Sequence, residues 1–168
     1  MAIIIRRYEE ADIDEMVRIW NEVVEEGKAF PQTELLTAET GKAFFGEQTW
    51  CGVAQDMTTG EIFGMYILHP NNIGRCGHIC NASYAVASRS RGEGIGRRLV
   101  EDSLKQASRL NFRIMQFNAV VKENCRARKL YESLGFVQLG SIPGGFRMKD
   151  GHLADIVLYY YLLEGCKA

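Results

Sequence analysis

The chain has 168 residues and a net charge of −1, and 46% of its residues are hydrophobic and 24% charged, as in a globular protein of one domain. This balance does not favour a nucleic-acid or membrane surface, the longest apolar run (156–163) is too short to cross a bilayer, and the N-terminus lacks the charge order of a signal peptide. Five cysteines without a Cys-x-x-Cys pair favour reduced thiols. We therefore expect a single cytoplasmic domain over residues 1–168.

Hydrophobic periodicity predicts that strands and helices alternate in the first half of the chain. A helix is expected to begin with Asp12 as its N-cap and to run to about Glu25. Its apolar residues fall on one face: Ile13, Met16, Val17, Trp20 and Val24. The other elements expected here, in chain order, are a strand at 2–8, a second helix within 33–46, and strands at 50–55 and 61–69.

The second half continues the alternation. A helix after Gly96 is expected to bury Leu99, Val100, Leu104 and Ala107. The remaining elements, in chain order, are a central strand at 76–87, a strand at 113–120, a helix from Asn124, and strands at 136–142 and 154–163. Hairpin-like and crossover connections both occur, so the fold class is α/β with a mixed sheet flanked by helices.

A glycine-rich segment, 91–97, joins the central strand to the next helix. Its glycines allow a tight turn with several N–H groups pointing one way, and the helix adds its positive N-terminal end. The segment therefore predicts a phosphate or pyrophosphate site, with a turn that binds nothing as the alternative. A P-loop is excluded because Gly-Lys-Ser/Thr is absent. A Rossmann fingerprint is excluded because Arg97 and Gln116 replace the third glycine and the acid.

A second segment, Asn124–Phe136, has the pattern of a helix with Asn124 as N-cap and Gly135 just beyond its end. It resembles the signature Asn-x-x-Ala-x-x-Leu-Tyr-x-x-Leu-Gly-Phe of the GCN5-related N-acetyltransferases (GNAT family). Arg91-x-x-Gly94-x-Gly96 resembles the acetyl-coenzyme A signature of the same family. The resemblance implies a central mixed, splayed sheet flanked by helices, and acetyl-CoA as cosubstrate.

The resemblance also implies roles for individual residues. The amides of Gly92–Arg97 would hold the pyrophosphate, and the pantetheine arm would run along the strand edge at 84–86. The Val86 amide would stabilise the oxyanion, and Tyr131 would protonate the leaving thiolate, with a core aromatic as its alternative. The expected coenzyme-binding residues are Tyr84, Ala85, Val86, Arg91, Gly92, Glu93, Gly94, Ile95, Gly96, Arg97, Asn124 and Tyr131.

Other charged residues are weaker candidates. Four arginines could meet the outer phosphate of the coenzyme, although a solvated helix face explains each of them at least as well: Arg97, Arg98, Arg126 and Arg128. No side chain is evident as the general base. Glu25 and Glu26 lie near the expected acceptor site, but a solvated helix end explains them better, and a water relay to a carbonyl or an asparagine is an alternative.

The middle of the chain, around Asn81 and Asn118, is similar to a GNAT subgroup known from yeast that acetylates proline analogues such as azetidine-2-carboxylate. In that subgroup, asparagines at these two positions lie near the acceptor and orient its carboxylate. Asparagines that tie down irregular backbone are the alternative. The subgroup has tryptophan where this chain has Tyr131, so the leaving-group chemistry and the substrate can differ.

The segment Gly144–Ile156 is similar to a glycine-rich loop of phosphinothricin-type acetyltransferases, which also modify small amino-acid-like amines. We therefore expect transfer of acetyl from acetyl-CoA to a primary or secondary amine of a small, amino-acid-like molecule, by direct attack in a ternary complex. The alternatives are a protein N-terminal or lysine acetyltransferase and a CoA-binding sensor without catalysis.

A further alternative is a zinc-binding module. Cys76, His78 and Cys80 alternate at strand spacing, with Cys51 or His69 as a fourth ligand. One strand presents three ligands poorly to a tetrahedral ion, so we expect no metal. We also expect no nucleic-acid or membrane partner. A homodimer is left open.

Overall fold

A computed structural model describes residues 2–163. The described residues form one seven-stranded sheet in the order β1-β2-β3-β4-β5-β7-β6. Neighbouring strands are antiparallel except for β4 and β5, which are parallel. The mixed α/β sheet expected from the sequence is therefore confirmed. The strands are β1 (Ile3–Arg7), β2 (Trp50–Asp56), β3 (Ile62–Pro70), β4 (Ile79–Val86), β5 (Ile114–Val121), β6 (Val137–Arg147) and β7 (Leu153–Leu162).

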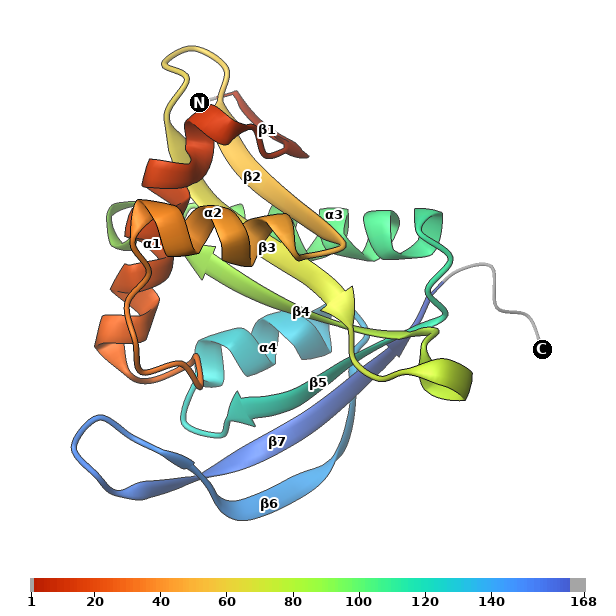
Figure 1. The fold of residues 1–168 in the computed structure, drawn as a ribbon. Helices are drawn as coiled ribbons and strands as arrows, with labels where there is room; N and C mark the ends of the chain where they lie inside the picture. Colours follow the sequence, from red (N-terminus) through yellow and green to blue (C-terminus); the bar gives the residue numbers. More distant parts are fainter. Residues whose placement is uncertain (1, 164–168) are drawn as a thin grey trace.

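The helices α1 (Ile13–Glu26) and α2 (Ala38–Gly46) pack on one face of the sheet, and α3 (Ile95–Arg109) and α4 (Cys125–Ser133) pack on the other (Figure 1). The apolar faces explain these two layers. All five residues predicted for the first helix face are buried. Leu99, Val100 and Ala107 of α3 are buried as expected, whereas Leu104 is half-buried.

Asp12 occupies the N-cap position of α1, as predicted, but its side chain does not cap the helix. Its carboxylate instead accepts hydrogen bonds from the Arg6 guanidinium at 2.7 and 2.9 Å and from the Glu9 amide at 2.7 Å. Burial favours a higher pKa for Asp12, but the Arg6 and Glu9 hydrogen bonds and the Arg6 charge outweigh it and hold the pKa below its usual value. Asp12 therefore ties β1 to the start of α1 rather than capping the helix.

Two strand boundaries also differ from the expectation. The central strand begins at Ile79 rather than 76, because Gly74–Cys76 form a 3-10 turn. The strand expected to end at 142 continues to Arg147 as β6, so Gly144 and Gly145 lie inside a strand rather than in a loop. A Cβ on Gly145 would lie 2.5 Å from Cγ1 of Ile156 on β7, so a side chain there would clash with β7.

The sheet opens between β4 and β5. These strands pair only at Ile79–Ile114 and Cys80–Met115, and then diverge (Figure 1). This confirms the splayed sheet that the family resemblance implied. Beyond Cys80, the edge of β4 that faces β5 has lost its partner strand.

Gly64 on β3 sets the position of α3 beside this opening. A Cβ there would lie 2.9 Å from the Ala85 carbonyl oxygen and 3.1 and 3.3 Å from Leu99 and Ile95. A glycine therefore allows the first turns of α3 to pack directly on β3, next to its register partner Val86. The N-terminus of α3 is thus held at the point where β4 and β5 have separated.

Between residues 2 and 163, no helix is both long and apolar enough to span a bilayer. The expected single domain over 1–168 and the cytoplasmic location stay predictions. Residues 1 and 164–168 lie outside the described part of the chain.

Candidate active site

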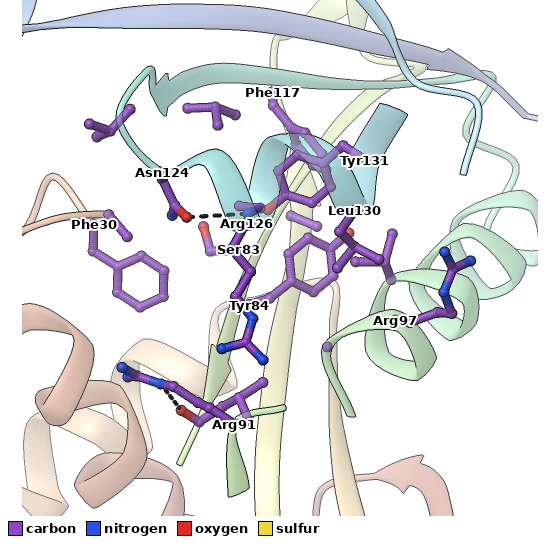
Figure 2. A pocket seen from close by; sticks show the side chains of 18 of the residues that line it. Phe30, Ser83, Tyr84, Arg91, Arg97, Phe117, Asn124, Arg126, Leu130 and Tyr131 are labelled. Carbon is purple, nitrogen blue, oxygen red and sulfur yellow. Dashed lines mark hydrogen bonds between the residues drawn. The ribbon is translucent and has the colours of Figure 1, made fainter. Parts of the chain in front are cut away.

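A cavity of about 500 Å³ lies at the opening between β4 and β5 (Figure 2). Residues 81–84 and 86 of β4 line one side of it, and residues 117–121 of β5 line the other. The glycine-rich segment that leads into α3 and the inner face of α4 close it at one end. Ala29, Phe30 and Pro31, from the connection between α1 and α2, close it at the other. The splayed strands thus expose one continuous site with two distinct ends.

The pairing of β3 with β4 determines which backbone groups face this cavity. In an antiparallel pair, hydrogen-bonded and non-bonded residue pairs alternate. The Ala87 amide donates to the Phe63 carbonyl, and the Asn71 amide donates to the Ile79 carbonyl. The odd-numbered residues of β4 therefore bond to β3, and the even-numbered ones direct their N–H and C=O groups toward β5.

Tyr84 and Val86 consequently turn their backbone groups into the opening, as the predicted roles require. The Val86 carbonyl accepts the Arg91 Nε–H at 3.3 Å, which agrees with this direction. Ala85 does not reach the cavity, because its backbone groups face Met65 of β3 and its side chain is buried in the cluster under α1. The predicted coenzyme role of Ala85 has no geometric support.

The glycine-rich segment forms an open N-terminus for α3. Gly92 and Gly94 have φ values of 98° and 80°, which side chains rarely adopt. Gly94 occupies the N-cap position, and no side chain caps the helix. The N–H groups of Ile95, Gly96 and Arg97 therefore have no partner within the helix and are free for an anion. The Glu93 side chain is exposed and lies outside the cavity wall.

The four candidate arginines separate into two pairs. Arg97 and Arg126 line the cavity, and Arg126 approaches Gly92 across its mouth. Arg98 donates to the Ile3 carbonyl at 3.0 Å, and Arg128 donates to the Tyr159 hydroxyl at 3.0 Å. The first pair faces the cavity, although Arg97 also donates to the Ser133 hydroxyl at 2.7 Å, whereas the second pair ties neighbouring elements together.

Neither glutamate candidate lines the cavity. The Glu26 carboxylate forms an ion pair with Arg91 at 2.7 Å. The Glu25 carbonyl accepts the Lys149 ammonium at 2.7 Å. Among the described residues that line the cavity there are arginines, but no aspartate, glutamate or histidine. The charge around the cavity is therefore positive.

Tyr131 lies on the cavity face of α4, among aromatic rings (Figure 2). Its ring centroid is 4.6 Å from that of Phe117 and 6.3 Å from that of Tyr84. Burial, helped by the nearby Tyr159, raises the Tyr131 pKa above its usual value. The raised pKa keeps the phenol protonated, and Tyr131 is one of the residues that line the cavity.

Three asparagines predicted for the site reach the cavity wall. Asn124 caps α4 as expected, accepting the Ala127 amide at 3.2 Å. Asn81 Oδ1 accepts the Ala82 amide at 2.8 Å. Asn118 on β5 forms a reciprocal amide pair with Asn71, a residue for which the sequence indicated no role.

The residues of the zinc alternative are not brought together. Cys76 lies in the exposed 3-10 turn, so the strand alternation assumed for it does not exist. Cys80 and Cys51 are buried in core clusters on opposite faces of the sheet. Across residues 2–163, no group of three His, Cys, Asp or Glu side chains could hold a metal ion. The proposed zinc set is therefore wrong.

The family model for the acetyltransferase (GNAT) family matches residues 13–136. The N-acetyltransferase aca1 of Schizosaccharomyces pombe is 32% identical over 158 residues, which cover 84% of this chain and 74% of that protein. A solved GCN5-related N-acetyltransferase from Kribbella flavida is 32% identical, with a TM-score of 0.89, and the match covers 96% of this chain and 98% of that one.

A phosphinothricin acetyltransferase from Sinorhizobium meliloti, solved in complex with acetyl-CoA, shares the fold at 21% identity and a TM-score of 0.88, over 97% of this chain and 89% of that one. The chain belongs to the GNAT family. It is an acyltransferase, and acetyl-CoA is the cosubstrate of its homologues. The proline-analogue subgroup and the likeness of residues 144–156 to phosphinothricin-type enzymes stay predictions.

The open N-terminus of α3 generates the first testable prediction. Gly94→Asp places a carboxylate where the pyrophosphate is expected, while Gly94→Asn has the same shape without the charge. Both residues tolerate positive φ better than most. Because one such repulsion is worth about 1–4 kcal/mol at 4 Å, we expect the aspartate variant to bind coenzyme A at least about tenfold more weakly than the asparagine variant. Calorimetric titration measures this, and equal affinities for the two variants would contradict the assignment.

Proposed function

We propose that the protein transfers the acetyl group of acetyl-CoA to the amine of a small amino-acid-like molecule, by direct attack in a ternary complex. The observation that carries this proposal is the unpaired edge of β4, which runs between an anion-binding helix N-terminus and a separate acceptor end of the same cavity. A screen for thiol release from acetyl-CoA with amino acids, proline analogues, polyamines, aminoglycosides and peptides tests it.

The coenzyme lies along β4 in this proposal. Its pyrophosphate takes the N–H groups at the start of α3, near Arg97 and Arg126. Its pantetheine arm, which carries amides, adds to the strand edge and bonds the backbone of Tyr84 and Val86 as a peptide strand would. Gly96 supports this path, because a Cβ there would contact Val86 and Leu130 at 3.9 and 3.7 Å, so the helix start lies next to the strand edge.

The reaction then needs a hydrogen-bond donor, a proton donor or a proton acceptor at each atom that gains charge or loses a proton. The neutral acceptor nitrogen attacks the thioester carbonyl carbon, and the carbonyl oxygen takes the electron pair. The Val86 N–H, directed into the opening, donates to this oxyanion. As the C–S bond breaks, sulfur takes the electron pair and Tyr131 donates its proton to the thiolate. The oxyanion's electron pair re-forms the C=O bond as the sulfur leaves. Water accepts the proton that the nitrogen loses and returns a proton to the Tyr131 phenolate, so the acid is restored.

The acceptor end favours an anionic group beside the amine. Since Asn81 Oδ1 is bound by the Ala82 N–H, the NH₂ end of this side chain is the end left for a ligand. Amide donors suit a carboxylate, and the arginines that line other parts of the cavity disfavour an acceptor with a further positive charge, such as a polyamine. This supports a small amino acid over the protein-acetyltransferase alternative.

The CoA-sensor alternative differs from catalysis in one observable. A sensor binds acetyl-CoA without turnover, so it releases no thiol with any amine. The protonated Tyr131 on the cavity wall supports catalysis instead, because a phenol in this place can give a proton to a bound thiolate.

Tyr131→Phe is expected to lower turnover by about 10²-fold and to leave coenzyme affinity unchanged, because only the proton donor is lost. The loss should shrink with an acyl donor whose thiol is more acidic. Tyr161→Phe is the matched control: this tyrosine packs on the same core but lies outside the cavity wall. Full activity of the Tyr131→Phe variant would show that Tyr131 only packs as a core aromatic.

Asn81→Ala is expected to raise the Michaelis constant for azetidine-2-carboxylate about tenfold to a hundredfold, because removing a donor to a carboxylate costs about 1–3 kcal/mol. The constant for acetyl-CoA should stay nearly unchanged. The Michaelis constant for azetidine, the same ring without the carboxylate, should change little, because azetidine has no carboxylate for Asn81 to bind. Steady-state kinetics with both acceptors measure the difference. An equal rise in the two Michaelis constants would show that Asn81 only fixes the strand backbone through the Ala82 amide.

A further inference from the structure

We propose that Asn71 is a positioning residue for the acceptor: its side-chain amide holds Asn118 in the orientation that binds the substrate carboxylate. This inference rests on the proposed function. It adds a residue of the β3–β4 connection, which lies outside the cavity wall, to the determinants of acceptor specificity.

The two side chains form a closed, reciprocal pair. Asn71 Nδ2 donates to Asn118 Oδ1 at 3.1 Å, and Asn118 Nδ2 donates to Asn71 Oδ1 at 2.6 Å. Gln116, two residues earlier on β5, donates a further hydrogen bond to Asn118 Oδ1 at 3.0 Å. Asn71 is itself fixed, because its backbone amide donates to the Ile79 carbonyl at 2.8 Å.

Asn118 needs such support because its strand provides little. Beyond Met115, β5 no longer pairs with β4. Its pairing with β7 is also interrupted between Phe117 and Val120. The Asn118 side chain is exposed, so without a partner it would sample several rotamers and would lose that freedom only when the substrate binds. The pair with Asn71 removes this freedom in advance.

The pair also selects which end of the Asn118 amide meets the substrate. Its oxygen already accepts two donors, from Asn71 and Gln116. Its NH₂ group has two hydrogens, of which Asn71 takes one. The second N–H remains for a ligand in the cavity that Asn118 lines. Like Asn81, Asn118 is therefore held as a donor, the form that a carboxylate requires.

The test is a double-mutant cycle with the full-length chain. Asn71→Ala should raise the Michaelis constant for azetidine-2-carboxylate about tenfold, with turnover number and the constants for azetidine and acetyl-CoA nearly unchanged. Asn118→Ala should have at least this effect, and adding Asn71→Ala to it should change nothing further, because Asn71 acts only through Asn118. Asn72→Ala is the control, since this neighbour is exposed and bonds only the Ile73 amide.

Three results would overturn the proposal: an unchanged Michaelis constant in Asn71→Ala, equal losses on both acceptors, or a full further loss when the change is added to Asn118→Ala. Should Asn71→Ala not fold, Asn71→Asp tests the same pair. The aspartate keeps an oxygen that can accept from Asn118, but it lacks the donor and adds a negative charge. It should therefore raise the Michaelis constant for azetidine-2-carboxylate more than that for azetidine. Failure of the unsubstituted protein to release thiol with any amino acid or proline analogue of the screen would overturn the proposed function itself, a result distinct from these three.

Discussion

The early end of the β4–β5 pairing is the constraint on which the rest of the site depends. After Cys80 the two parallel strands separate, so the even-numbered residues of β4 direct backbone groups into an opening rather than to a neighbour. Unpaired backbone donors and acceptors need a partner of some kind. For the Ala82 amide, the side chain of Asn81 supplies this partner. At Val86 the carbonyl accepts the Arg91 Nε–H. In the function we propose, a ligand with amides of its own pairs with the rest of the edge at Tyr84 and Val86.

The start of α3 gathers hydrogen-bond donors and positive charge at one end of this opening, because its first amides are uncapped and Arg97 and Arg126 line the cavity beside them. The ion pair of Arg91 with Glu26 links this segment to the last turn of α1, from which the chain continues to Phe30 on the cavity wall. The glycine-rich segment and the connection between α1 and α2 are therefore linked through one ion pair as well as through the cavity that both line.

Much of this architecture could be predicted from the sequence. Hydrophobic periodicity located the helices, and the glycines at 92 and 94 predicted the tight turn into α3, because both signals are local. The zinc alternative failed because it assumed an extended strand through 76, where Gly74–Cys76 form a 3-10 turn. Asp12 stands at the predicted N-cap position of α1, but its carboxylate pairs with Arg6 of β1 instead of capping the helix.

The finer geometry depends on register, which a local pattern does not contain. Tyr84, Ala85 and Val86 are consecutive, and only their pairing with β3 decides that Ala85 turns away from the cavity. Asn71 was missed for a similar reason. It lies in a polar turn of ordinary composition, and its significance comes from a contact with a residue 47 positions later in the chain.

Amide hydrogen exchange, measured residue by residue by NMR, tests the central claim most directly. In the free protein the amides of Tyr84 and Val86 should exchange fast, and the amide of Ala85 slowly, because only the last is bonded to β3. Acetyl-CoA should slow exchange at Tyr84 and Val86 and leave Ala85 as it was. If coenzyme binds and the exchange of Tyr84 and Val86 does not change, the unpaired edge of β4 is not where its arm lies, and the account is wrong.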